Sequence, residues 1–144
     1  MSRLFFLTLS LMLVSSPMSF ADPKKNSFVV IVNKANGVGT ISKGMLRTIY
    51  LRKISRWPSG AEIAPIDMPS GSQPRAAFSR EILKVSSEDL AVYWIDQHIT
   101  RSIRPPKELE TMTAIKEQVA ARPGAIAYIP LEAVDGTIKA LEVQ

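Results

Sequence analysis

Short blocks of apolar residues, separated by residues that favour turns, predict four strands along the chain. Phe28–Val32 and Ala125–Ile129 are continuous apolar runs, which are typical of strands buried on both faces. Thr137–Val143 alternates apolar and polar residues and predicts a half-exposed final strand. Glu62–Asp67 predicts a short strand in which Pro65 favours an edge position or irregular pairing, because proline has no N–H to donate.

Two helices are predicted in the first half of the chain. Ser42 is a suitable N-cap for a helix whose apolar residues fall on one face, namely Met45, Leu46, Ile49 and Tyr50. A second helix, from about Pro74 to Leu83, presents Phe78 and Ile82 to the core at i,i+4 spacing.

Two more helices are predicted in the second half. Ser86–Asp89 carries capping signals for a helix that runs to about Ile99. A helix over Met112–Ala121 is expected to end before Pro123 and Gly124. Because strands alternate with helices, we expect one α/β domain with ligands at the carboxyl ends of its strands.

Residues 1–21 have the pattern of a cleaved signal peptide. Arg3 precedes the interrupted apolar stretch Leu4–Val14, and Ser19–Ala21 provides a small-x-small cleavage site. We therefore expect residues 22–144 to form the exported, periplasmic domain, with a retained N-terminal anchor as the alternative. The apolar stretch is short for a membrane span, which needs about 20 apolar residues.

The chain has no cysteine, which excludes disulfides, thiol catalysis and cysteine-based metal sites. Without Arg3, 17 basic and 13 acidic residues remain, a net charge of +4. The segment from Pro23 to Ala61 has no acid and contains eight of the basic residues: Lys24, Lys25, Lys34, Lys43, Arg47, Arg52, Lys53 and Arg56. This segment is suited either to attracting anions or to keeping the protein soluble. Nucleic acid is not an expected partner, because no basic and aromatic stacking surface is evident.

The loop before the second helix contains residues suited to an oxyanion. Ser70, Gly71, Ser72 and Gln73 offer backbone N–H groups and hydroxyls at the start of a helix, and Arg75 offers a charge. The alternative is an ordinary helix cap, in which Ser72 or Gln73 precedes a proline in the first turn. The residues alone favour the cap, and the anion site stays open.

The glycine-rich stretch from Asn36 to Thr40 follows the first strand, and Thr40 is a further candidate ligand residue. The stretch lacks the Gly-Lys-Ser/Thr of a P-loop, so a turn is the simpler interpretation. Nothing in the sequence predicts an enzyme: His98 is the only histidine, and G-x-S-x-G and S-x-x-K are both missing. No metal site or cofactor is expected.

An ordered series of segments resembles one lobe of the periplasmic phosphate-binding proteins of ABC transporters. The segments are Val30–Asn33, Ile41–Tyr50, Ile54–Trp57, Ile63–Asp67, Ser70–Ser72, Phe78 and Pro123–Tyr128. The resemblance covers about Phe28 to Pro130. It implies a single lobe of a type II periplasmic-binding-protein-like fold, with a mixed α/β sheet flanked by helices. It also implies a module that binds phosphate or a related oxyanion for, or beside, an ABC transporter.

The sequence departs from this family in the loop that holds phosphate. Gly71 and Ser72 match the family's Gly-Ser pair, but Met68 stands in place of its arginine, and Gln73 and Pro74 replace its next glycine and threonine. Arg75 is the residue that would replace the lost charge. The expected partners are an oxyanion, an ABC transporter permease or another periplasmic protein, and a second copy that covers the cleft. The alternative function is an accessory module that kept the fold and lost the anion site.

Overall fold

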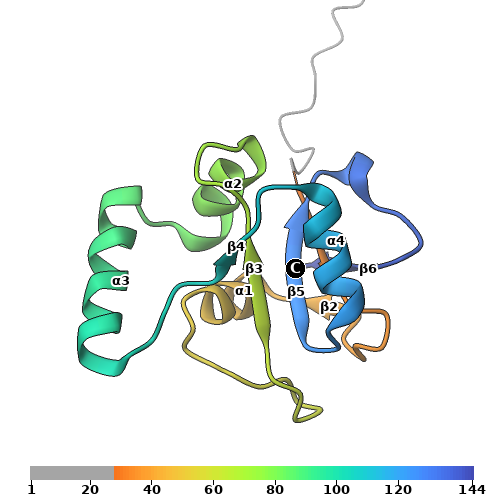
Figure 1. Cartoon of the computed structure of the whole chain (residues 1–144), viewed down its shortest axis with the longest axis horizontal. Coiled ribbons are helices and arrows are strands. Elements are labelled where there is room, and N and C mark those ends of the chain that lie inside the picture. Colours follow the sequence, from red (N-terminus) through yellow and green to blue (C-terminus); the bar gives the residue numbers. More distant parts are fainter. Residues whose placement is uncertain (1–27) are drawn as a thin grey trace, which may run out of the picture.

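The computed structural model describes residues 28–144, and the predicted signal peptide lies outside them. Six strands in this region form one sheet, in the order β2-β6-β1-β5-β3-β4 (Figure 1). They are β1 (Val29–Val32), β2 (Thr40–Ile41), β3 (Ala64–Asp67), β4 (Lys107–Glu108), β5 (Ala125–Ile129) and β6 (Lys139–Val143). β1 is antiparallel to both of its neighbours, β5 and β6, and all other pairings are parallel. The sheet is therefore mixed.

Helices flank this sheet on both faces. They are α1 (Lys43–Tyr50), α2 (Gln73–Phe78), α3 (Ser87–Arg101) and α4 (Met112–Ala121), with a π-helical turn η1 (Ser79–Leu83) and a 3-10 turn η2 (Leu131–Ala133). α4 lies in front of the sheet in Figure 1 and α1 lies behind it, while α3 stands apart from the body on the left. The predicted fold class, a mixed α/β sheet flanked by helices, is confirmed.

The core is built around the two strands that the sequence predicts to be buried on both faces. Every residue of β5 is buried, and Val30, Ile31 and Val32 of β1 have no exposed surface. Tyr128 packs against the aromatic rings behind the sheet, so its neighbour Ala127 faces α4, because successive residues of a strand point to opposite faces. The small residue lets the helix lie close to the strand.

Hydroxyl side chains begin the helices where the sequence predicts them. The Ser42 hydroxyl accepts from the Met45 N–H at 3.1 Å, and the Ser86 hydroxyl accepts from the Asp89 N–H at 3.1 Å. α4 begins after Thr111 and ends at Ala121, as Pro123 and Gly124 predict. These helix limits are local properties of the sequence.

One expectation about packing is wrong. Met45 was expected on the buried face of α1, but it is 45% exposed because it lies at the border of that face and turns towards a surface groove. Of the two alternatives that Pro65 predicts for β3, an edge position is excluded, because β4 pairs outside it. The irregular pairing that Pro65 predicts is confirmed: Ala64 and Pro65 pair with β5, whereas the following two residues pair with β4.

Gly124 is the point at which three segments meet. Its carbonyl accepts from the Trp57 indole N–H at 3.0 Å and from the Ala64 N–H at 3.0 Å. A Cβ added at Gly124 would overlap the Glu62 carbonyl oxygen far inside van der Waals contact. The approach of two backbones therefore requires glycine here.

We predict that Gly124→Ala lowers the free energy of unfolding by about 3 kcal/mol or more, because the methyl group must displace the backbone at Glu62. Gly136→Ala is the control, since a Cβ there meets nothing within 4 Å. It is expected to change stability by less than about 0.5 kcal/mol. Urea unfolding of both variants checks this, and equal stabilities would contradict the assigned packing.

Candidate functional site

The loop between β3 and α2 closes on itself through Ser72. The Ser72 N–H and hydroxyl both donate to the Pro69 carbonyl, at 2.9 and 2.8 Å. The same hydroxyl accepts from the Arg75 N–H at 3.4 Å, so Ser72 is the N-cap of α2. The helix cap that the sequence favours is confirmed. Because the hydroxyl proton is already donated, this geometry leaves it none for an anion.

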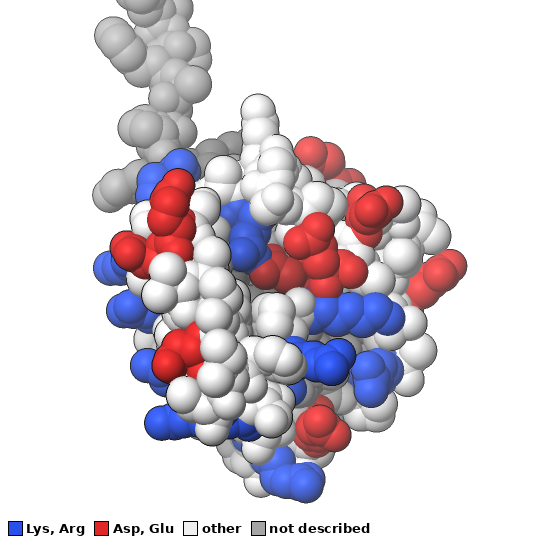
Figure 2. Space-filling model, turned by 60° about the vertical axis from the view of Figure 1, so that its left-hand side comes forward, with Lys and Arg blue, Asp and Glu red and all other residues white. Residues whose placement is uncertain are grey.

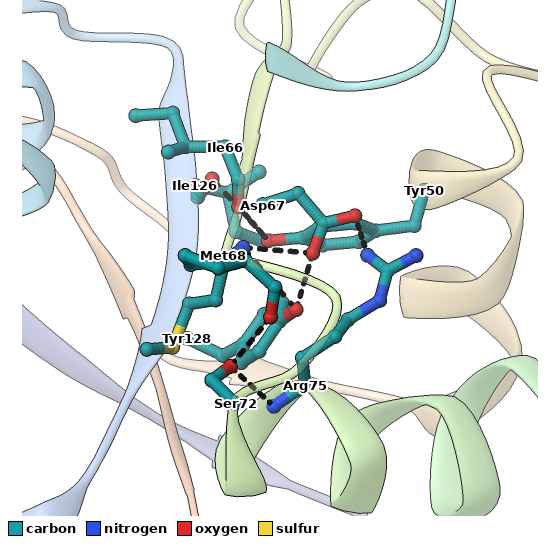
Figure 3. Close-up of polar contacts among 9 residues, drawn as sticks. Tyr50, Ile66, Asp67, Met68, Ser72, Arg75, Ile126 and Tyr128 are labelled. Atoms are coloured by element: carbon teal, nitrogen blue, oxygen red, sulfur yellow. Dashed lines mark hydrogen bonds and ion pairs between the residues drawn. The ribbon is translucent and has the colours of Figure 1, made fainter. Parts of the chain in front are cut away.

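A buried carboxylate at the end of β3 organises the side chains around this loop (Figure 3). Asp67 forms an ion pair with Arg75 and accepts a hydrogen bond from the Tyr128 hydroxyl. The Met68 N–H also donates to the Asp67 carboxylate, at 2.9 Å. Asp67 is 7% exposed, so it depends on these donors in place of water.

The Asp67–Arg75 pair changes the interpretation of the predicted anion site. The sequence offers Arg75 as the charge that replaces the one lost at Met68, but here the charge of Arg75 is balanced by a carboxylate. Met68 is 4% exposed and belongs to the core. Sequence reasoning missed Asp67 as a site residue. The available signal was an acid that ends an otherwise apolar strand shortly before an arginine.

Tyrosines and a phenylalanine form the buried support of the carboxylate. The Tyr128 ring stacks on Phe78 with centroids 4.0 Å apart, and Tyr50 packs against Phe78 at 4.6 Å. The Tyr50 hydroxyl donates to the Ile66 carbonyl at 3.0 Å. Burial raises the pKa of Tyr50 well above its usual value. Burial also raises the pKa of Tyr128, although the charge of Arg75 opposes the increase.

Backbone donors are still available on the loop. Within residues 28–144, the N–H groups of Ser70, Gly71 and Gln73 donate to no protein acceptor, and all of these residues are exposed. They lie just before α2 or at its first residue, where unpaired N–H groups carry partial positive charge. The loop thus has backbone donors without protein acceptors, although its hydroxyl and its arginine are engaged elsewhere.

A cleft of about 900 Å³ lies beside this loop, bounded by α2, η1, α3 and β4. Ser70 and Arg75 line it, whereas Gly71, Ser72 and Gln73 do not. Its other charged residues have both signs: Asp67, Arg80, Lys84, Asp89 and Glu108. Acidic and basic side chains also lie close together on the face seen in Figure 2. The electrostatic potential in the cleft is therefore neither uniformly positive nor uniformly negative.

Thr40 is separated from the other predicted ligand residues. It lies in β2 and lines a different groove, of about 450 Å³, together with Met45, Ile54 and Trp57. Arg56 is the charged residue of that mainly apolar groove. The structure thus brings together Ser70 to Arg75 and leaves Thr40 outside this group.

The described residues, 28–144, contain no group of three or more His, Asp or Glu side chains arranged to hold a metal ion. In the same part of the chain, no helix has the length and apolar character needed to cross a membrane.

No model of a known protein family matches the chain. Solved structures of phosphate-transport proteins do resemble it. A phosphate ABC transporter substrate-binding protein from Clostridium perfringens, solved with bound phosphate, is 26% identical with a TM-score of 0.65, over 81% of this chain and 44% of that chain. An ABC-type phosphate transport receptor from Vibrio cholerae is 20% identical with a TM-score of 0.61, over 81% and 46%. PstS from Borrelia burgdorferi is 15% identical with a TM-score of 0.62, over 82% and 47%.

The chain spans less than half the length of each of these structures. At these identities the similarity establishes the fold: the α/β arrangement is that of part of these phosphate-transport proteins. The described region is thus a solute-binding-like module, as the order of segments in the sequence predicts.

We predict that Asp67→Asn lowers the free energy of unfolding by about 3 kcal/mol, because it leaves the nearly buried Arg75 without a counter-charge. The double variant Asp67→Asn/Arg75→Met is expected to be more stable than the sum of the two single changes by about 2 kcal/mol. Urea unfolding of the single and double variants measures the coupling free energy between Asp67 and Arg75. The exposed pair Lys116–Asp135 is the control, and its coupling is expected to be much smaller.

We predict that stability falls above pH 10, because the buried tyrosines stay protonated in the folded state while they ionise in the unfolded state. A tyrosine with a raised folded pKa stabilises fully below its unfolded pKa, and this contribution is lost as pH rises towards the folded pKa. The loss is at most about 1 kcal/mol per tyrosine at pH 11.

Tyr50→Phe tests this dependence, since it removes one titrating group. The variant is expected to be less stable at pH 7 by about 1 kcal/mol, because the hydrogen bond to Ile66 is lost. The difference from the unchanged protein narrows as the pH rises from 9 to 11. Stability curves that stay parallel over this range would contradict the role given to burial.

Proposed function

We propose that this chain is a periplasmic solute-binding-like module that takes phosphate or a related oxyanion at the loop from Ser70 to Gln73 and at Arg75. The observation that carries the proposal is the set of exposed backbone N–H groups at Ser70, Gly71 and Gln73, which donate to no acceptor in the described residues. Arg75 lines the same cleft as Ser70. This loop follows the carboxyl end of β3, the end at which α/β sheets bind ligands.

Each group has a different task in the proposed site. The backbone N–H groups donate to the oxyanion, and Ser72 holds the loop in shape through its bonds to Pro69 and Arg75. Arg75 engages Asp67 through Nη1, and its guanidinium has further N–H donors. The pair holds the guanidinium in place, while the carboxylate charge weakens the attraction for an anion. Thr40 has no part in this proposal.

The proposed cellular setting is supported by the similar structures and by the predicted leader. The similar structures are named as phosphate-transport proteins. The leader predicted at residues 1–21 would direct the chain to the periplasm. We therefore propose that the module acts for, or beside, an ABC transporter, with a permease or another periplasmic protein as its partner. It is proposed to act by binding, without catalysis.

One observation favours a second function, an accessory module that interacts with another protein and binds no anion. The Asp67–Arg75 pair cancels the charge on which phosphate affinity depends, and Met68 is buried where the resembling family has its arginine. In this function the fold remains, and the charge cluster at the end of β3 serves only stability.

Calorimetry with phosphate and sulfate tests the proposed anion site. We predict that Arg75→Gln weakens phosphate binding about 10- to 100-fold, since it removes a charged hydrogen bond. Asp67→Asn is expected to strengthen binding about tenfold, because it removes the competing carboxylate. Phosphate binding to each variant is measured under conditions in which circular dichroism shows the variant to be folded.

Arg122→Gln is the matched control, because it changes the net charge equally at an exposed residue that follows α4. Its phosphate affinity is expected to stay within about twofold of the unchanged protein, since distant exposed charges are screened. No heat and no thermal shift at millimolar phosphate, in the protein and in Asp67→Asn, would contradict the anion site and support the accessory function.

A further inference from the structure

A mainly apolar groove of about 450 Å³ lies between β2, the first turn of α1 and the segment that carries Trp57. Its apolar lining combines buried side chains with side chains that are open to solvent. The buried ones are Ile41, Trp57 and Ile63, and the more exposed ones are Val38, Met45, Ile54 and Pro58. This volume and this lining are typical of a site for a small organic molecule.

Trp57 holds one wall of the groove in place. Its indole N–H donates to the Gly124 carbonyl at 3.0 Å, so the ring offers apolar surface and no free donor. Its backbone N–H donates to the Ala61 carbonyl at 2.9 Å, and its carbonyl accepts from the Gly60 N–H at 2.8 Å. These bonds close the turn from Trp57 to Ala61. The wall is therefore ordered before a ligand binds, which lowers the cost of binding.

Arg56 gives the groove a positive charge. Its Nη1 donates to the Gly60 carbonyl at 3.0 Å, which positions the guanidinium and leaves it further N–H donors. Among the described residues, no Asp or Glu lines the groove, and none forms an ion pair with Arg56. Glu62, which pairs with Arg56 across the turn, lines a different pocket. The charge of Arg56 is thus unbalanced, unlike that of Arg75.

The other side of the groove supplies hydrogen-bond donors. β2 lies at one edge of the sheet (Figure 1). The carbonyls of Gly39 and Ile41 accept from β6, so the Thr40 N–H between them faces away from β6. Within residues 28–144, neither this N–H nor the Ser42 hydroxyl donates to a protein acceptor. Both residues line the groove.

We propose that this groove binds a small monocarboxylate with an aliphatic tail. The tail displaces water from the apolar lining, and the carboxylate pairs with the planar guanidinium of Arg56. The Thr40 N–H and the Ser42 hydroxyl are the further donors that such an acid can use. One unbalanced positive charge favours a head group with a single negative charge, because a divalent phosphate would leave a charge unpaired.

This site is separate from the anion loop. The groove shares no lining residue with the cleft that contains Ser70 and Arg75. Thr40, which the sequence grouped with that loop, belongs to the groove. The inference therefore does not depend on phosphate binding, and millimolar phosphate is expected to leave the binding of the carboxylate unchanged.

Octanoate is the probe for this site, and octanol and octylammonium are its matched controls, since they carry the same tail on a neutral or a positive head. We expect octanoate to bind with a Kd of about 1 mM. Octanol is expected to bind about tenfold more weakly, and octylammonium more weakly still. Acetate has the head without the tail and is expected not to bind in this range.

NMR of isotope-labelled methionine methyl groups locates the binding. The Met45 methyl resonance is expected to shift with octanoate, because Met45 lines the groove and is 45% exposed. The resonances of Met68 and Met112 are internal controls and are expected to stay in place, because neither residue lines the groove. The Thr40 amide resonance is a second reporter.

Two variants separate the head from the tail. Arg56→Gln is expected to weaken octanoate binding about tenfold and to change octanol binding less than about twofold. Met45→Gln, followed at the Thr40 amide, is expected to weaken both about threefold, because it makes part of the lining polar. Arg47→Gln is the matched control for charge, since Arg47 is exposed on α1 and does not line the groove. It is expected to change both affinities less than about twofold.

Three results would overturn the proposal. The first is that octanoate up to about 10 mM moves neither the Met45 methyl nor the Thr40 amide resonance. The second is that octylammonium binds as tightly as octanoate, or that Arg56→Gln leaves octanoate binding unchanged. The third is a dimer in sedimentation that Met45→Glu dissociates and octanoate does not, which assigns the groove to a second copy of the chain.

Discussion

The interaction on which this loop depends is the one between the Asp67 carboxylate and its donors. A charge at the end of a buried strand is costly unless it is paired and hydrogen-bonded. Here a guanidinium from α2, a phenol from β5 and a backbone N–H share that task. The position of α2 relative to β3 and β5 is thereby tied to one side chain, and so is the loop from Ser70 to Gln73.

In the proposed anion site, the same interaction sets stability against anion binding. An arginine that neutralises a buried carboxylate contributes less to an external anion than a free arginine does. A loop with open N–H groups and a neutralised arginine is therefore suited to modest affinity. The neighbouring cleft, whose charges have both signs, does not change that balance.

Much of the fold could be predicted from the sequence because its signals are local. Continuous apolar runs mark β1 and β5, hydroxyl residues such as Ser42 begin helices, and Pro123 with Gly124 ends α4. The Asp67–Arg75 pair could not be predicted, because it depends on how α2 turns back over the end of β3. The exposure of Val92, Ile95 and Ile99 on α3 could not be predicted for a related reason. Apolar residues at helical spacing indicate a face that favours burial, but only the tertiary structure shows whether another part of the chain covers that face.

The order of strands has a consequence for how the chain becomes folded. β1 is one of the two central strands, yet its partners β5 and β6 are contributed by the last twenty residues of the sequence. Val30 lies opposite Leu141, and Val32 lies opposite Ile126. Contacts between such distant positions form late and slowly. When only the first hundred residues have been synthesised, β1 has neither of its two partner strands. The sheet can therefore be completed only after β6 has left the ribosome. Until then the chain is incompletely folded and accessible to chaperones.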